Sequence, residues 1–79
     1  MKELTQETLS TEIFSLCLQE PQSIETITNA IYKNMYAKNL VRIYLCVQIM
    51  LKREILVPMF SNKEILFKVH DKILNKVKK

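Results

Sequence analysis

Basic and amide side chains recur along one side of the helix that the sequence predicts from about Tyr36 to Arg53. The cationic side chains on this side are Lys38, Arg42, Lys52 and Arg53. Two amide side chains, Asn39 and Gln48, lie beside them. Lysine and arginine neutralise phosphates, whereas arginine and asparagine also form paired hydrogen bonds with guanine and adenine edges. The chemistry that this pattern predicts is contact with a polyanion, above all with duplex DNA.

The residue types that catalysis needs occur only as isolated side chains. His70 is the one histidine, no serine or cysteine is spaced to act with it, and the acidic residues are scattered. The chain has no glycine from which to build a phosphate-binding loop. We therefore expect no enzymatic activity, no cofactor and no site for a small ligand.

The two cysteines stand alone on predicted helices. Cys17 and Cys46 lack the close spacing of zinc ligands, so no metal site is expected. The simpler interpretation is two small, buried apolar residues. A disulfide is the alternative, and it is more plausible in a hyperthermophilic host.

Length and composition indicate one small domain, residues 1–79, with a basic surface. The chain has 79 residues, 48% of them hydrophobic, a formal net charge of +4 and an isoelectric point near 9.2. A chain of this length buries only about 60–65% of its unfolded surface. We expect homodimerisation to supply further buried area.

No apolar run approaches the ~20 residues that span a bilayer, and the first ten residues lack the apolar core of a signal peptide. The expected location is therefore cytoplasmic, without membrane contact.

Two helices precede the basic one. The first is predicted over about Thr5–Gln19 and ends before Pro21, which forces the preceding residue out of the helical region. Ser23 suits the N-cap of the second helix, and Lys33-Asn34 closes it. In the turn that follows, we expect Asn34 to adopt the left-handed conformation, where glycine is more usual.

The third helix, about 36–53, has a continuous apolar face and a second, unexpected apolar feature. Its predicted core face comprises Leu40, Ile43, Tyr44, Val47, Met50 and Leu51. Leu45 and Ile49 instead project from the basic side. A solvated helix has no reason to display them, so they indicate a neighbouring element, a second subunit or another protein.

A hairpin and a short helix complete the chain. The apolar runs 55–60 and 64–69 predict two strands joined by Ser61, Asn62 and Lys63, with Asn62 suited to a positive φ. The backbone nitrogen side of Pro58 should face outward, at an edge or a bulge, because proline cannot donate to a strand ladder. Residues 71–79 predict a last helix with lysines towards its end.

This order resembles the winged helix-turn-helix domain over about residues 9–69. The stretch Leu51-Lys52-Arg53-Glu54-Ile55-Leu56-Val57 resembles the exit from that family's recognition helix, although Ile55 stands where glycine is usual. The chain is similar to minimal dimeric regulators of the arsenic-responsive and multiple-antibiotic-resistance types. It is also similar to short archaeal and archaeal-virus regulators. The fold implied is α+β, mostly α, with three helices, a hairpin wing and a fourth helix.

The resemblance implies a homodimeric regulator of transcription, more plausibly a repressor, that binds duplex DNA. The expected DNA contacts lie in three groups: the recognition helix in the major groove, phosphate contacts at the turn, and the wing on the backbone or minor groove. They are Tyr36, Lys38, Asn39 and Arg42; Ser23, Lys33 and Asn34; and Ser61, Asn62 and Lys63. The expected dimer contacts are Leu4, Leu9, Ile73, Leu74 and Val77.

A protein-interaction module is the alternative, since winged-helix domains also serve as docking units. Leu45 and Ile49 favour it, because they are apolar side chains on the basic side of the helix. A partner covering that side would keep the helix out of DNA. A third possibility combines the two: a dimer partner covers part of the helix while its N-terminal turn still reaches a groove.

Overall fold

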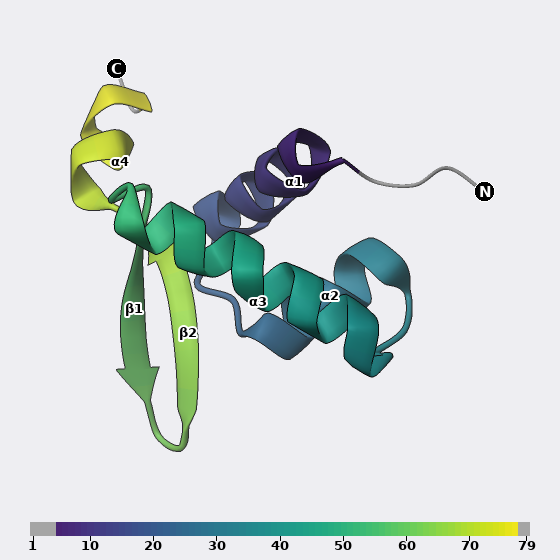
Figure 1. Ribbon diagram of the computed structural model, residues 1–79. Coiled ribbons are helices and arrows are strands. Elements are labelled where there is room, and N and C mark those ends of the chain that lie inside the picture. The colour runs from purple at the N-terminus through teal and green to yellow at the C-terminus, as the bar shows by residue number, and fades with distance from the viewer. Residues whose placement is uncertain (1–4, 78–79) are drawn as a thin grey trace.

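The computed structural model describes residues 5–77, and its element order confirms the predicted α+β layout (Figure 1). Three helices come first, then an antiparallel hairpin and a short fourth helix: α1 (Gln6–Gln19), α2 (Ile24–Tyr32), α3 (Ala37–Lys52), β1 (Leu56–Ser61), β2 (Glu64–Val69) and α4 (Asp71–Val77). This layout is compatible with a winged helix.

Hydroxyl side chains begin the first two helices. The hydroxyl of Thr5 accepts a hydrogen bond from the backbone N–H of Thr8 at 3.1 Å, and that of Ser23 accepts one from Thr26 at 3.1 Å. Each bond satisfies a donor that the helix itself leaves unpaired. The predicted N-cap at Ser23 is confirmed.

The turn between α2 and α3 corrects one prediction. Lys33, with φ of 63°, is the left-handed residue that ends α2, and Asn34 is not. Lys33 therefore bears the steric cost of this conformation, while the side chain of Asn34 has another role. Its amide group holds the turn together by hydrogen bonds on both sides.

The exit from α3 also uses a residue other than the expected one. Glu54, with φ of 59°, takes the left-handed position, and the N–H of Ile55 bonds to the carbonyl of Met50 at 2.9 Å. The N–H of Glu54 bonds to the carbonyl of Leu51 at 3.0 Å, which completes a Schellman motif. Ile55 in the place of glycine therefore costs little, because its own φ is not positive.

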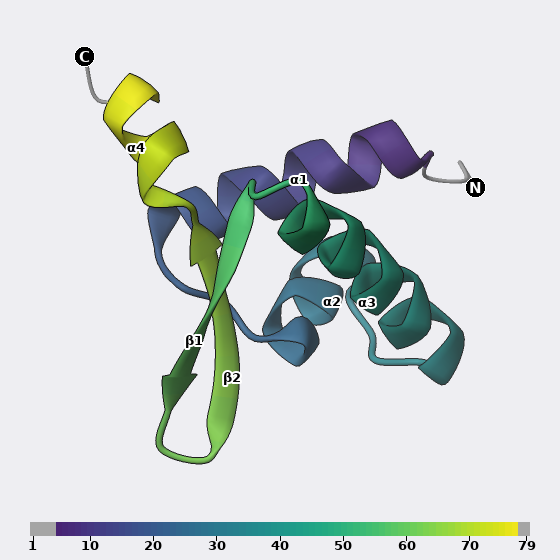
Figure 2. The ribbon, with the colours of Figure 1, turned by 60° about the vertical axis from the view of Figure 1, so that its left-hand side comes forward.

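The hairpin pairs Leu56 with Val69 at its base and Ser61 with Glu64 at its tip. Asn62 has a positive φ of 52°, as predicted. The register puts Pro58 opposite Phe67, whose N–H and C=O both bond to Gln22, at 2.7 and 3.0 Å. The connector between α1 and α2 thus runs beside β2 (Figure 2), and Pro58 faces outward from the edge strand β1, as predicted.

The core lies where α1, α2 and α3 meet the base of the hairpin, while the rest of the hairpin projects beyond the body (Figures 1 and 2). Its buried members are Leu9, Ile13, Cys17, Ile27, Ile43, Cys46, Val47, Met50, Leu56, Phe67 and Val69. Leu9 is only 2% exposed, so its prediction as a dimer contact is wrong. Periodicity put Leu9 on an apolar stripe but did not show that α3 covers that stripe.

The other residues expected at a dimer interface have different positions. Ile73 and Leu74 on α4 are half-buried and pack against the core of their own chain. Leu4 and the side chain of Val77 lie outside the described part of the structure. Contact of α4 with a second subunit therefore stays a prediction. It would involve only the exposed parts of the Ile73 and Leu74 side chains.

Candidate nucleic-acid interface

The outer side of α3 carries one straight ridge of side chains. Its members follow each other at alternating spacings of three and four residues: Lys38, Val41, Leu45, Gln48 and Lys52. Val41 and Leu45 at its centre are each 54% exposed, and Lys38 and Lys52 at its ends are also exposed. We call these five residues the outer ridge. It combines an apolar centre with cationic ends.

Asn39 does not belong to this exposed surface. Its side chain is only 7% exposed, and its amide nitrogen donates a hydrogen bond to Oδ1 of Asn34 at 2.9 Å. The same oxygen accepts from the backbone N–H of Tyr36 at 3.1 Å, while the amide nitrogen of Asn34 donates to the carbonyl of Tyr32 at 3.0 Å. We call Asn34 and Asn39 the amide pair. The prediction that Asn39 enters a groove is wrong, because the pair joins α2 to α3.

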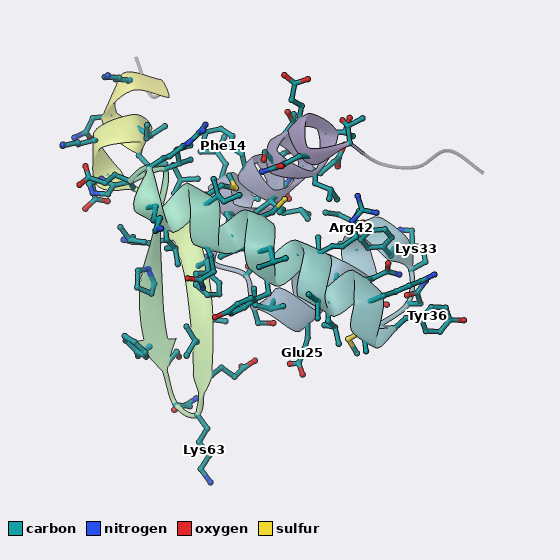
Figure 3. All side chains as sticks on the ribbon, in the orientation of Figure 1. Phe14, Glu25, Lys33, Tyr36, Arg42 and Lys63 are labelled. Carbon is teal, nitrogen blue, oxygen red and sulfur yellow. The ribbon has the colours of Figure 1, made fainter. Side chains whose placement is uncertain are left out.

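At the start of α2, the hydroxyl of Ser23 is committed to its cap. Ser23 is only 7% exposed, and its Oγ lies 2.9 Å from the hydroxyl of Thr26 as well as accepting from that residue's N–H. This burial contradicts a phosphate contact through its side chain. Glu25 beside it is exposed and acidic, and it extends from the same side of the molecule as Lys63 (Figure 3).

Arg42 lies on the flank of α3 that faces α1. It lines a groove of about 430 Å³ between these helices, together with Gln6, Leu9, Leu45, Cys46, Gln48, Ile49 and Lys52. Its side chain extends towards this flank, away from the hairpin tip (Figure 3). Arg42 is half-buried and engaged in an interaction within the chain, so its place beside α1 is partly structural.

The opposite flank of α3 faces the hairpin across a second groove of about 490 Å³. Apolar side chains form most of its lining, and charged residues stand among them: Leu40, Tyr44, Ile24, Ile65 and Phe67, with Ser23, Glu25, Lys63 and Glu64. Tyr44 is 50% exposed, so its prediction as a core residue is wrong. Tyr44 lies at the margin of the apolar face of α3, where it lines this groove and does not enter the core.

The wing tip presents polar groups, with an apolar pair just behind them. Asn62 and Lys63 are exposed, and Ser61 is half-buried. Phe60 pairs across the strands with Ile65, and their exposed fractions are 77% and 50%. The sequence predicted that both residues lie in strands. They are exposed because this part of the hairpin extends beyond the core.

Charge is divided unevenly along the chain. Residues 33–79 carry 11 of the 12 basic residues but only three of the eight acidic ones. Within residues 5–77, Lys68 and Lys72 form exposed ion pairs with Asp71 and Glu54, at 3.7 and 3.5 Å. Such pairs contribute little to stability. The cations of α3 and the wing belong to the positive part of the chain.

The sulfur and imidazole groups have structural roles. Cys17 and Cys46 are free, buried thiols, as the simpler interpretation predicted. Burial raises the pKa of Cys17 to about 12 and also raises that of Cys46, where a hydrogen bond with Ser10 opposes the effect. His70 accepts the N–H of Lys72 on Nδ1 at 3.1 Å and so caps α4.

Within residues 5–77, no group of three or more His, Cys, Asp or Glu side chains is arranged to hold a metal ion. Nor is any helix of that described range both long and apolar enough to cross a membrane.

The chain matches no protein-family model, no curated protein and no solved structure.

Proposed function

We propose that this chain is a winged-helix protein that binds duplex DNA and regulates transcription as a homodimeric repressor. One observation carries the proposal: four of the five outer-ridge residues of α3 are exposed, with only Gln48 half-buried, and the hairpin projects beside α3 with Lys63 at its tip (Figure 3). A helix of this kind fits the major groove, and a hairpin beside it reaches the neighbouring backbone or minor groove.

The N-terminal end of α3 is suited to contact a phosphate group of the DNA. No side chain of the described residues caps it. The carbonyl of Tyr36 accepts from Asn39 and Leu40, which leaves the N–H groups of Ala37 and Lys38 outside the helical ladder. Open N–H groups and a neighbouring lysine favour an anion at this point. We assign phosphate contacts to this end, to exposed Lys33 and to Lys63.

The base contacts in this proposal differ from those the sequence predicted. Tyr36 is 64% exposed, and Lys38 is also exposed, so both remain candidates for the major groove. The buried Asn39 leaves the set. Arg42 remains only as a flanking contact, because it points towards α1.

Dimerisation is part of the proposal, because α4 is short and extends from the body at the end opposite the wing (Figures 1 and 2). A second copy packed against α4 would bury the exposed parts of Ile73 and Leu74. Two-fold symmetry would then place two recognition helices on half-sites about one helical turn apart.

The wing provides the test of DNA binding. Lys63→Ala should weaken binding to a preferred duplex and to random duplex about equally, because a phosphate contact carries no sequence information. The loss should be several-fold at low ionic strength, and the slope of log affinity against log salt should fall by roughly one. Fluorescence anisotropy with labelled duplexes over a salt series measures both quantities.

Lys76→Ala is the matched control for this titration, since it removes one lysine from α4 instead of the wing. Equal effects of the two variants would show that only net charge matters, and would remove the wing from the interface. If wild-type protein does not bind duplex DNA even at low salt, the proposed function is wrong.

A second candidate function is a protein-docking module, favoured by Leu45 and Ile49 beside the groove between α1 and α3. They are 54% and 37% exposed, and the groove behind them is largely apolar. Leu45→Asp should abolish association with a protein occupant of this groove, because a carboxylate would then be buried without a partner. Sedimentation velocity of the purified chain detects the case in which the occupant is a second copy. An unchanged profile would contradict self-association through this groove.

A further inference from the structure

We infer that the outer ridge of α3 reads thymine methyl groups, so that the protein prefers duplexes rich in A·T pairs. The inference rests on the proposed function, because it names the base chemistry that α3 would recognise. It concerns Val41 and Leu45 as specificity-determining residues.

Two of the side chains expected to read bases by hydrogen bonds do not lie at the centre of the outer surface of α3. Asn39 is buried in the amide pair, and Arg42 is engaged on the flank towards α1. The side chains left at the centre of the outer surface are Val41 and Leu45, each 54% exposed. At these two positions the helix would meet the bases through methyl groups, whereas Tyr36 and Lys38 at its N-terminal end remain for polar contacts.

The major groove distinguishes thymine from the other bases by a methyl group. Thymine alone among the four bases presents a methyl group in this groove, and apolar side chains contact it favourably. Against a G·C pair, Val41 and Leu45 would desolvate donors and acceptors without replacing their hydrogen bonds. The same ridge therefore favours thymine and disfavours guanine and cytosine.

The spacing of Val41 and Leu45 suits the spacing of base pairs. Val41 and Leu45 are four residues apart, a rise of about 6 Å along the helix axis. Two base-pair steps along the DNA axis span about 6.8 Å. The two side chains can therefore contact methyl groups that lie two steps apart, if the helix axis follows the groove.

The charges of the outer ridge indicate which kind of ligand covers it. Lys38 and Lys52 stand on the same line, before Val41 and after Leu45, and the ridge has no acidic member. Cationic ends around an apolar centre suit a ligand whose phosphates flank apolar groups. Duplex DNA has that arrangement, whereas a purely apolar protein surface would bury both lysines without partners.

The test compares duplexes that differ only in the methyl group. Alternating dA-dT and dA-dU duplexes of equal length are titrated with wild-type protein at one salt concentration. We expect tighter binding to dA-dT, by roughly three- to fivefold for each methyl group contacted. Val41→Ala should lower the ratio of the two affinities by about the same three- to fivefold, because Leu45 still contacts its methyl group, and Val41→Ala combined with Leu45→Ala should bring the ratio close to one. Val41→Ala should change affinity for dA-dU little, because no methyl contact exists there to lose.

Met59→Ala is the matched control, because it also shortens an exposed apolar side chain, but on the hairpin. It should leave the preference for dA-dT unchanged. Circular dichroism confirms that both variants are folded, and Val41→Ser, which carries no methyl group, replaces Val41→Ala if that variant is not.

The outcomes separate this inference from the function on which it rests. Binding to both duplexes with equal affinity, or a preference that Val41→Ala leaves intact, would overturn methyl readout while DNA binding stands. No binding to either duplex would instead contradict the proposed function itself.

Discussion

Lys38→Glu is expected to lower affinity for duplex DNA roughly 100-fold at low salt. The substitution removes a cation from the N-terminal end of α3 and puts a carboxylate where the proposal places phosphate. The fold itself should survive, because an acidic residue in the first turn interacts favourably with the helix dipole and α3 has none there. If the variant loses DNA binding while its melting temperature is unchanged or raised, the cause is the lost contact between Lys38 and phosphate and not unfolding.

The control must change net charge equally at another place. Lys76→Glu does so on α4, at the end of the molecule away from the wing (Figure 1). If the proposed face is correct, this variant should bind DNA with only a few-fold loss, from the weaker long-range field. Similar losses in both variants would mean that binding follows net charge alone and that α3 is not the contacting element.

The second large effect is expected from Asn34→Ala, which should lower the free energy of unfolding by about 2 kcal/mol. The amide oxygen of Asn34 accepts from both Asn39 and the N–H of Tyr36, at 2.9 and 3.1 Å. Removing it leaves the buried amide group of Asn39 without this acceptor. The bond from Asn34 to the carbonyl of Tyr32 is lost as well. Urea unfolding followed by circular dichroism measures the change.

Two comparisons make this prediction specific. Asn34→Asp keeps an oxygen for both donors but loses the bond to Tyr32, so its destabilisation should be intermediate. Asn29→Ala removes an exposed asparagine from the same region of α2 and should change stability by no more than about 0.5 kcal/mol. An Asn34→Ala protein as stable as wild type would show that the amide pair contributes little to the joint between α2 and α3.

The amide pair and the outer ridge together explain why the recognition surface differs from the one that residue types suggested. Asparagine is an ordinary reader of adenine, and Asn39 lies in the first turn of α3. In this chain the turn before α3 contains no glycine, and Lys33 takes the left-handed position. The turn is held by side-chain hydrogen bonds instead. The residue best suited to read a base is therefore used to join two helices.

Local patterns in the sequence sufficed for the helices, the hairpin and several single residues. The N-cap at Ser23, the positive φ of Asn62 and the outward Pro58 each follow from the backbone chemistry of that residue type. Such rules act over a few neighbouring residues. For this reason they hold before the position of any distant element is known.

The amino-acid sequence by itself determined which elements form, where they begin and that the later part of the chain is basic. The tertiary structure alone decided which edge of a helix's apolar face is buried by a neighbouring element. Asn39 and Cys46 lie on the α3 flank turned towards α2 and α1 and are buried, whereas Tyr44 faces the groove beside the hairpin and stays exposed. Periodicity assigns an angle around a helix axis. Burial at that angle depends on whether another element packs there, and this depends on contacts between residues distant in the chain.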